Sequence, residues 1–383
     1  MTKPKPFEVR WTPAQVEAVL ERVRTYPWPP APAVPDGWGY GCDEGYLRSL
    51  CAHWTQGYDW KAAVADLNRF PQFTAQVEDF DLHFLHVMGE AGGKRPLIVT
   101  HGWPGSHYEF WQVIEKLAFP SRFGGQASDA FDLVVPSLPG FGFSSKPERP
   151  IGQRTTARLF NTLMTEVLGY QSYLAQGGDW GAMVTSWLAR EHGANARAIH
   201  INMLGFRPHG GPQGEAEIAW AQRQEAAGNA MGAYLRLQIS KPQSVAWLGA
   251  GNPVGQAAWI AERFHDWSDL REKPFDAVHP MDRLLTNIMI YVMTESFATG
   301  AWYYRGLIEE GGLAFAAGER LETPTAFANF PGEPLYAAPP RSFAERAYNV
   351  VRWSEMARGG HFAAMEEPDL FVDDVRAWAR EAG

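Results

Sequence analysis

The feature that most constrains this chain is a series of short, wholly apolar runs that alternate with helical stretches. A short run without polar alternation is typical of a strand buried on both faces. Strands that alternate with helices predict an α/β fold, with a mainly parallel sheet and helices on both faces. Two runs ahead of them, 73–79 and 81–88, have the pattern of a hairpin. The expected buried strands are 96–100, 131–135, 173–176 and 198–203, with helices at 108–117 and 157–168.

The alternation stops between residues 207 and 310, where the sequence predicts several helices and no buried strand. It resumes with expected strands at 325–329 and 347–353. A helical block between two strands of one sheet has to lie above the sheet, at the carboxyl ends of the strands, where open α/β sheets hold their sites. The expected division is therefore an N-terminal wrapping segment at 1–72, a core at 73–206 and 311–383, and a helical lid at 207–310.

Composition argues against several classes of protein. The 383 residues carry a formal net charge of −9, whereas a surface that binds nucleic acid is basic. The sequence has no apolar run of the roughly 18 residues that a membrane-spanning helix needs. Its start has no apolar stretch of the signal-peptide type. We therefore expect neither nucleic acid nor membrane as a partner, and a cytoplasmic location.

The two cysteines, Cys42 and Cys51, have no metal-ligand spacing and are expected to be reduced thiols. Aromatic residues are frequent, with 16 Trp, 13 Tyr and 22 Phe. They fit either a large aromatic core or a deep apolar pocket for a bulky substrate. The count alone does not choose between these interpretations.

The segment Gly177-Gly178-Asp179-Trp180-Gly181 directly follows an expected buried strand. Small residues on both sides of a central one are typical of a nucleophile elbow, a strand-to-helix turn too tight for larger side chains. Asp179 takes the place of the usual serine. Because a carboxylate is already ionised, it can attack an electrophilic carbon, such as that of an epoxide or an alkyl halide, and form an ester that water must hydrolyse. The alternative is that Asp179 only caps the following helix.

A second Gly-rich turn, His101-Gly102-Trp103-Pro104-Gly105-Ser106, follows the expected strand at 96–100. An oxyanion hole of this kind takes one N–H from the residue after the nucleophile and one from the loop after an early strand. Trp180 and Trp103 occupy these two positions. The alternative is a Gly/Pro turn with a structural histidine.

His361 is the predicted base, because it follows the last expected strand and the base comes last in the chain order nucleophile, acid, base. The acid that orients the imidazole is expected in the loop after residues 325–329, where Glu333 is the candidate. For any single carboxylate, a solvated surface position is the alternative. The weaker candidates for the acid are Glu355, Glu366 and Asp373.

Four segments form a specific set: HGWPGS at 101–106, GGDWG at 177–181, FPGE at 330–333 and RGGHFAAMEEP at 358–368. Together they resemble the microsomal-type and juvenile-hormone-type epoxide hydrolases, over nearly the whole chain. The resemblance implies the α/β-hydrolase fold, with an eight-stranded sheet, and a reaction without metal or organic cofactor. The membrane anchor at the N-terminus of the animal enzymes has no counterpart here, so a soluble enzyme is expected.

The resemblance also implies two lid tyrosines that hold the epoxide oxygen, and it assigns them to Tyr234 and Tyr304. Tyr303 is adjacent to Tyr304 and keeps the second assignment open. From the residues alone, these tyrosines would be ordinary aromatic core positions on helices.

The expected function is hydrolysis of a small apolar epoxide to a vicinal diol, through an ester on Asp179. The nearest alternative is a haloalkane or haloacid dehalogenase with the same acid and base, in which Trp180 would be one halide donor. A non-catalytic α/β protein would have no need for both a nucleophile and a base. A serine esterase is disfavoured because the sequence has no Gly-x-Ser-x-Gly motif. A homodimer stays an open expectation.

Overall fold

The computed structural model describes residues 3–34, 37–90, 92 and 95–382, and these form one nine-stranded sheet in the order β1-β2-β3-β5-β4-β6-β7-β8-β9. Neighbouring strands from β5 to β9 pair in parallel, whereas the pairs β1–β2, β2–β3 and β3–β5 are antiparallel. The strands are β1 Lys5–Pro6, β2 Gln72–Val77, β3 Phe80–Val87, β4 Pro96–Thr100, β5 Asp132–Pro136, β6 Tyr173–Gly177, β7 Ala196–Ile201, β8 Leu321–Asn329 and β9 Tyr348–Glu355.

The mainly parallel α/β class is confirmed, but the expected number of eight strands is wrong. The additional strand is β1, which extends the β2–β3 hairpin by pairing Lys5 with Thr74 and Pro6 with Phe73. Two residues are too few for an alternating pattern, so the sequence gives no sign of this strand.

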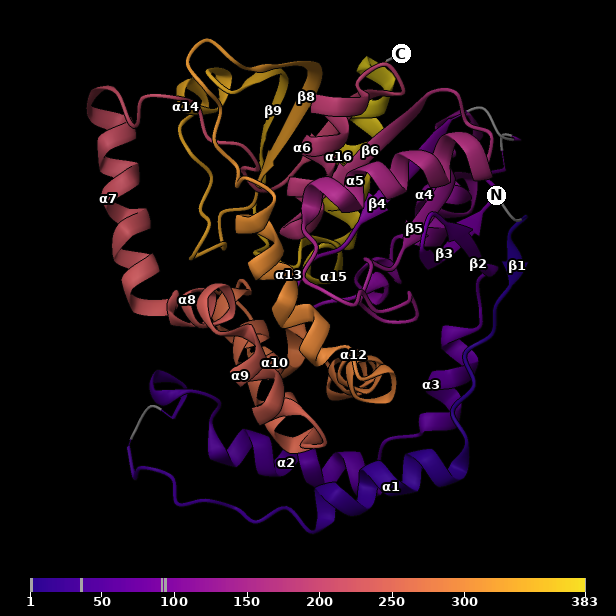
Figure 1. Ribbon diagram of the computed structural model, residues 1–383, viewed down its shortest axis with the longest axis vertical. Helices are drawn as coiled ribbons and strands as arrows, with labels where there is room; N and C mark the ends of the chain where they lie inside the picture. Colours follow the sequence, from indigo (N-terminus) through magenta and orange to yellow (C-terminus); the bar gives the residue numbers. More distant parts are fainter. Residues whose placement is uncertain (1–2, 35–36, 91, 93–94, 383) are drawn as a thin grey trace.

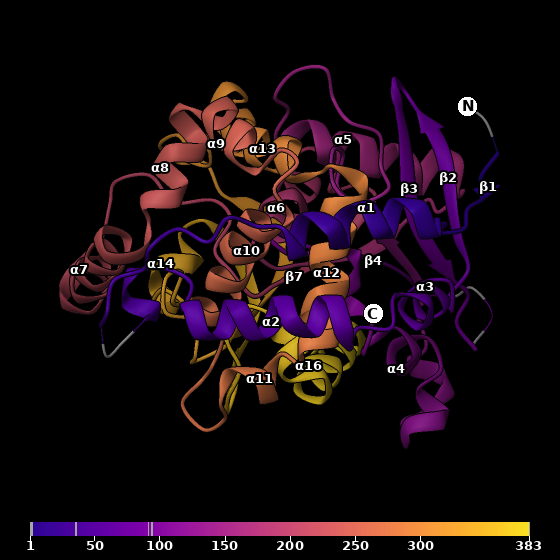
Figure 2. The same cartoon turned by 90° about the horizontal axis from the view of Figure 1, so that it is seen from below.

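The central strands are apolar because both of their faces are covered. Every residue of β5 and β6 is buried, and Leu97, Ile98 and Val99 of β4 have no exposed surface. Figure 2 shows α5 and α6 on one side of the sheet and α4 and α16 on the other. The core helices are α4 Ile114–Ala118, α5 Gln153–Thr162, α6 Trp180–His192, α14 Arg341–Glu345, α15 Ala363–Glu366 and α16 Pro368–Glu381.

The two helices expected in the first half of the core are each interrupted. The stretch 108–117 is a 3-10 turn, η2 (His107–Phe110), followed by α4. His107, Tyr108 and Phe110 of η2 are buried. The stretch 157–168 is α5 followed by a π-helical turn, η5 (Leu163–Val167). The remaining 3-10 turns are η1 Trp38–Tyr40, η3 Pro120–Phe123 and η4 Ala127–Asp129.

Seven helices lie between β7 and β8, and residues 207–310, all of which are described, add no strand to the sheet. Figure 1 shows α7 standing away from the sheet, and α8, α9, α10, α12 and α13 beneath it. The expected lid boundaries at 207 and 310 stay predictions. The helices are α7 Gly214–Met231, α8 Ala233–Ser240, α9 Pro242–Gly249, α10 Pro253–Trp267, α11 Phe275–Val278, α12 Met281–Thr294 and α13 Phe297–Glu309.

The last lid helix, α13, is fixed to the start of α5. Glycines let the two segments touch, since a Cβ added to Gly306 would lie 2.0 Å from the carbonyl oxygen of Ile151. Glu310, just after α13, accepts three backbone N–H groups at the start of α5, with N···O distances of 2.8 to 3.2 Å. These are donors that a helix leaves unsatisfied at its N-terminus. The lid is therefore joined to the core by polar contacts as well as by packing.

The N-terminal segment wraps the lid with α1 (Pro13–Arg24), α2 (Glu44–Gln56) and α3 (Trp60–Leu67). Helix α1 begins with a capping box, in which the Thr12 hydroxyl accepts the Gln15 backbone N–H and the Gln15 side chain accepts the Thr12 backbone N–H. Helices α1 and α2 pack on α10 and α12, as Figures 1 and 2 show. Just before α3, the Tyr58 hydroxyl is hydrogen-bonded to Thr286 of α12 at 3.0 Å. Residues 1, 2, 35 and 36 of this segment lie outside the described residues.

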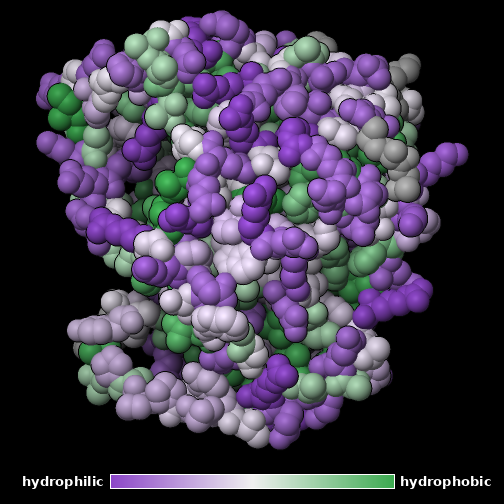
Figure 3. Space-filling model, viewed as in Figure 1, coloured by the Kyte–Doolittle hydropathy of each residue, from purple (hydrophilic) through white to green (hydrophobic). Residues whose placement is uncertain are grey.

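Figure 3 shows a mostly hydrophilic face, with apolar side chains visible mainly in its recesses. Cys42 and Cys51 are both free thiols. In the described part of the chain, no helix combines the length and the apolar character needed to cross a membrane.

Candidate active site

The turn between β6 and α6 holds Asp179 in a strained conformation, with φ 48° and ψ −127°. L residues seldom adopt such a positive φ. The flanking glycines are required by close contacts, because a Cβ on Gly181 would lie 1.8 Å from the carbonyl oxygen of Thr100. A Cβ on Gly177 would lie 2.2 Å from the carbonyl carbon of Gly181. The tight turn projects the Asp179 carboxylate beyond the carboxyl end of the sheet.

The loop after β4 approaches this carboxylate directly. The backbone N–H of Trp103 donates to Asp179 Oδ1 at 2.8 Å. A Cβ on Gly102 would lie 2.3 Å from the same oxygen, so only glycine allows the approach. Trp180 is the first residue of α6, and its N–H belongs to the donors that a helix leaves free at its start. Trp103 and Trp180 are therefore both placed beside the Asp179 carboxylate.

His101 keeps this loop in place and lies outside the reacting groups. Its Nδ1 is hydrogen-bonded to the Gly102 carbonyl oxygen at 2.9 Å, and Leu138 donates its N–H to Nε2 at 3.1 Å. Burial lowers the pKa of His101 to about 4, so the imidazole is neutral at neutral pH. The structure thus gives His101 the structural position that the sequence offered as the alternative.

His361 lies between two carboxylates. Its Nε2 is 3.3 Å from Asp179 Oδ2, and its Nδ1 is 2.5 Å from Glu333 Oε2. Burial lowers the pKa of His361, but the charges and hydrogen bonds of Glu333 and Asp179 outweigh burial and hold the pKa well above its usual value. The imidazole is therefore a cation while Asp179 is ionised.

Of the four candidate acids, Glu333 is the one that contacts the imidazole. Its other oxygen accepts the backbone N–H groups of Leu335 and Tyr336, both at 3.0 Å. Glu366 instead accepts backbone N–H groups on both sides of His361, from Gly360 and Phe362. Glu355 and Asp373 are engaged elsewhere, Glu355 with Asn329 and Trp353, and Asp373 with Arg376.

The two lid tyrosines face the same space from different helices. Tyr234 of α8 stacks on the Trp103 ring, with centroids 5.4 Å apart. Tyr304 of α13 packs edge-on against Trp180 at 4.5 Å and Tyr234 at 5.9 Å. The neighbouring Tyr303 points into the core instead, where its hydroxyl donates to Thr156 of α5 at 2.7 Å. The structure therefore places the Tyr304 ring between those of Tyr234 and Trp180, and engages the Tyr303 hydroxyl with Thr156.

Three further residues belong to this site, and the sequence did not point to them. The Tyr336 hydroxyl lies 2.7 Å from that of Tyr234. The Trp267 ring centroid lies 4.8 Å from that of His361, and the backbone carbonyl oxygen of Trp267 accepts the backbone N–H of His361. Glu109 is buried behind the Gly102 loop, where burial and the nearby Asp179 charge raise its pKa to about 8. Only the short spacing from Glu333 could have drawn attention to Tyr336.

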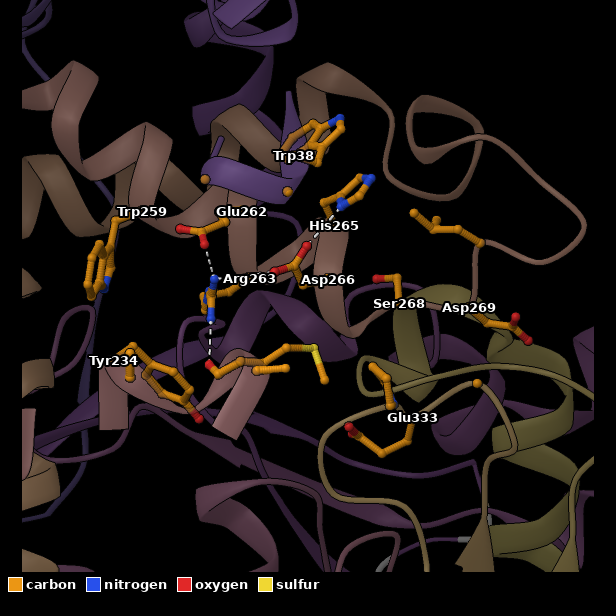
Figure 4. A pocket seen from close by; sticks show the side chains of 18 of the residues that line it. Trp38, Tyr234, Trp259, Glu262, Arg263, His265, Asp266, Ser268, Asp269 and Glu333 are labelled. Atoms are coloured by element: carbon orange, nitrogen blue, oxygen red, sulfur yellow. Dashed lines mark hydrogen bonds and ion pairs between the residues drawn. The ribbon is translucent and has the colours of Figure 1, made fainter. Parts of the chain in front are cut away.

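A cleft of about 990 Å³ lies beside this cluster, and Tyr234 and Glu333 form part of its wall. Figure 4 shows Arg263 of α10 beside Glu262 among the residues that line this cleft. Arg263 donates hydrogen bonds to Glu262 and to the Met231 carbonyl oxygen. Asp179 is not among the lining residues that the structure describes. Tyr234 and Glu333 are thus the members of the cluster that reach the cleft.

The strand order, the turn after β6 and the helical insertion define an α/β hydrolase, and residues 95–222 match the family described as the alpha/beta hydrolase fold. Residues 4–110 match the family described as the epoxide hydrolase N terminus. The chain is 38% identical to a putative epoxide hydrolase of Stigmatella aurantiaca, over 98% of this chain and 84% of that protein. It is 33% identical to epoxide hydrolase 1 of Oryctolagus cuniculus, over 97% and 87%.

Two solved structures are similar over the whole chain. The Aspergillus niger epoxide hydrolase matches with a TM-score of 0.87 and 30% identity, covering 100% of this chain and 97% of that one. The juvenile hormone epoxide hydrolase of Bombyx mori matches with a TM-score of 0.87 and 27% identity, covering 100% and 95%. The chain belongs to the epoxide hydrolase family and is a hydrolase.

Proposed function

We propose that this enzyme converts an apolar epoxide to a vicinal diol through an ester on Asp179. The observation that carries the proposal is the position of one carboxylate. Asp179 has one oxygen 2.8 Å from the Trp103 N–H and the other 3.3 Å from His361 Nε2. A nucleophile, an oxyanion donor and a base thus meet at a single side chain.

In the first half of the reaction, Tyr234 and Tyr304 donate hydrogen bonds to the epoxide oxygen. Asp179 Oδ2, which lies outside the oxyanion site, attacks a ring carbon. The carbon–oxygen bond breaks, and its electron pair stays with the oxygen, which takes a proton from a tyrosine. Both tyrosines are buried, and burial raises the pKa of each well above its usual value. They therefore enter the reaction as proton donors.

In the second half, the ester has removed the Asp179 charge, so the His361 imidazolium releases its proton to solvent and becomes neutral; it regains that proton when the Asp179 carboxylate forms again. The neutral His361 takes a proton from a water molecule, which attacks the ester carbonyl carbon. Negative charge develops on Asp179 Oδ1, where the N–H groups of Trp103 and Trp180 stabilise it. The diol oxygen leaves with a proton from His361. The regenerated Asp179 carboxyl returns a proton to the tyrosine, so the sum is epoxide plus water giving diol.

The substrate class follows from the walls of the site. Trp103, Trp180 and Trp267 offer aromatic surfaces on several sides of the Asp179 carboxylate. Such walls favour an apolar substituent on the epoxide, while the hydroxyls provide the polar contacts. A cytoplasmic location and a homodimer stay predictions, which cell fractionation and light scattering would check.

The test is a single turnover with excess enzyme and styrene oxide in water enriched in ¹⁸O. We expect label in the Asp179 carboxylate, because water attacks the ester carbonyl. Asp179→Asn should form no ester, and His361→Gln should accumulate it as a mass increase on the Asp179 peptide. Label found in the diol alone would mean direct attack of water on the epoxide, and would exclude Asp179 as the nucleophile.

A haloalkane dehalogenase is the second candidate. It is favoured by the Trp180 indole N–H, which is buried and has no partner in the described part of the chain, because such a donor can hold a halide. Halide release from 1-bromobutane without diol formation from styrene oxide would support this alternative and overturn the first proposal.

A further inference from the structure

Tyr336 lies where the lid and the loop of Glu333 meet. Its hydroxyl is 2.7 Å from the Tyr234 hydroxyl, a bond in which either oxygen can be the donor. Its backbone N–H is held by Glu333 Oε1 at 3.0 Å. The carboxylate that orients His361 therefore also fixes the residue that contacts Tyr234.

We infer that Tyr336 is a positioning residue for Tyr234, and that it donates a hydrogen bond to the Tyr234 oxygen while Tyr234 donates to the epoxide. This inference rests on the proposed function. It also assigns the proton that the epoxide oxygen receives to Tyr234 rather than to Tyr304.

The direction of the hydrogen bond between Tyr336 and Tyr234 follows because a hydroxyl has one proton to donate and two lone pairs that can accept. Once Tyr234 directs its proton at the epoxide oxygen, its own oxygen can only accept. Tyr336 must then be the donor, in the order Tyr336, Tyr234, epoxide oxygen. Hydrogen bonds in such a chain strengthen one another, so Tyr336 increases the polarisation of the epoxide.

The need for this donor arises during ring opening. The Tyr234 proton moves to the oxygen that leaves carbon, and Tyr234 becomes a phenolate for the time that the ester exists. Burial disfavours that charge. The Tyr336 O–H, with its oxygen 2.7 Å from that of Tyr234, stabilises this charge.

The test separates the two halves of the reaction. Excess enzyme is mixed rapidly with styrene oxide and quenched, and the ester on the Asp179 peptide is followed by mass. We expect Tyr336→Phe to slow ester formation about tenfold, the effect of losing one hydrogen bond, and to leave the rate of ester hydrolysis unchanged. The matched control is Tyr303→Phe, which removes a buried hydroxyl bonded to Thr156 and should leave both rates unchanged.

A double-mutant cycle gives the second readout. In a Tyr234→Phe background, Tyr336→Phe should have no further effect, because it acts through the hydroxyl already removed. The inference is overturned if the two effects multiply, if ester formation is unchanged in Tyr336→Phe, or if both steps slow equally, as displacement of the Glu333 loop would cause. If the wild-type enzyme forms no ester on Asp179, the proposed function fails, and the inference fails with it. Ester formation at an equal rate in Tyr336→Phe overturns the inference alone.

Discussion

His361 and Glu333 are joined by a 2.5 Å hydrogen bond between Nδ1 and Oε2, and the second oxygen of the same carboxylate is held by two backbone N–H groups. The carboxylate is thus fixed from the protein side before it meets the imidazole. It sets the tautomer in which Nδ1 carries the proton and Nε2 is the base.

Replacing Glu333 by Gln should slow ester hydrolysis by about 10²- to 10⁴-fold. The amide can keep the backbone bonds through its oxygen, but it turns an NH₂ group toward Nδ1 and so favours the wrong tautomer. The measurement is the rate of ester loss after rapid mixing. Ester should accumulate, since its formation does not need the base. Unchanged hydrolysis would show that Glu333 does not orient His361.

The pKa of His361 should fall when Asp179 becomes an ester. Burial lowers this pKa, and the charges of Glu333 and Asp179 raise it above its usual value. The ester removes the Asp179 charge, so the remaining balance favours the neutral imidazole that hydrolysis needs. We expect hydrolysis to rise with pH to a plateau, with a midpoint below the His361 pKa of the free enzyme.

This comparison can be made directly by NMR titration of the imidazole. Asp179→Asn imitates the neutral state, and it should lower the His361 pKa relative to the wild-type protein. An equal pKa in both proteins would contradict the ion pair seen at 3.3 Å.

Tyr303 and Tyr304 should differ in what their hydroxyls do. Tyr304→Phe should slow ester formation by about 10²-fold, in the range found for removal of one donor to a developing oxyanion. Tyr303→Phe removes the hydrogen bond that the Thr156 hydroxyl accepts, while Thr156 still donates to the Gly152 carbonyl oxygen. The variant should cost about 1 kcal/mol of unfolding free energy with unchanged turnover. Urea denaturation and the single-turnover rates distinguish the two. A loss of turnover in Tyr303→Phe would reverse the assignment.

Glu109 should make the fold less stable as pH rises. Burial raises its pKa from the usual 4.5 to about 8, so the folded state binds the proton more tightly than the unfolded state. The contribution of the protonated Glu109 carboxyl to the free energy of unfolding is fully present below pH 4.5 and is lost as pH rises through about 8. Glu109→Gln keeps the acceptor for the Gly102 N–H but does not titrate.

Relative to the wild-type protein, this variant should therefore gain stability between pH 5 and pH 8.5, on the order of a few kcal/mol. Urea denaturation at both pH values measures the difference. If the difference in unfolding free energy between Glu109→Gln and the wild-type protein does not change with pH, the Glu109 carboxyl is ionised in the folded protein.

The groups with a local signature could be found from the sequence. Asp179 lies in a turn whose glycines are required by contacts as short as 1.8 Å, and such a turn leaves the same pattern wherever it occurs. The buried strand at Pro96–Thr100 has its predicted bounds, because both of its faces are apolar. His361 and Glu333 follow strands in the expected order, and the structure brings them together.

Other parts depend on contacts between distant segments and leave no local pattern. Strand β1 is defined by its partner β2, over only two residues. Tyr336 resembles any loop tyrosine until α8 brings Tyr234 to it. The rotation of α13 about its axis decides which of Tyr303 and Tyr304 faces the site. The close contact of Gly306 with Ile151 contributes to that rotation. The raised pKa of Glu109 comes from burial, which sequence alone does not give.

The attachment of α13 to α5 has a consequence for how substrate enters. Glu310 and Gly306 hold α13 against the core, so Tyr304 keeps its position relative to the sheet and to the turn that holds Asp179. Tyr234 comes from α8, which packs against α13, so both tyrosines are held relative to the Asp179 turn by the same attachment. We therefore expect an epoxide to enter from the cleft beside Tyr234 and Glu333, with the polarising pair already in place.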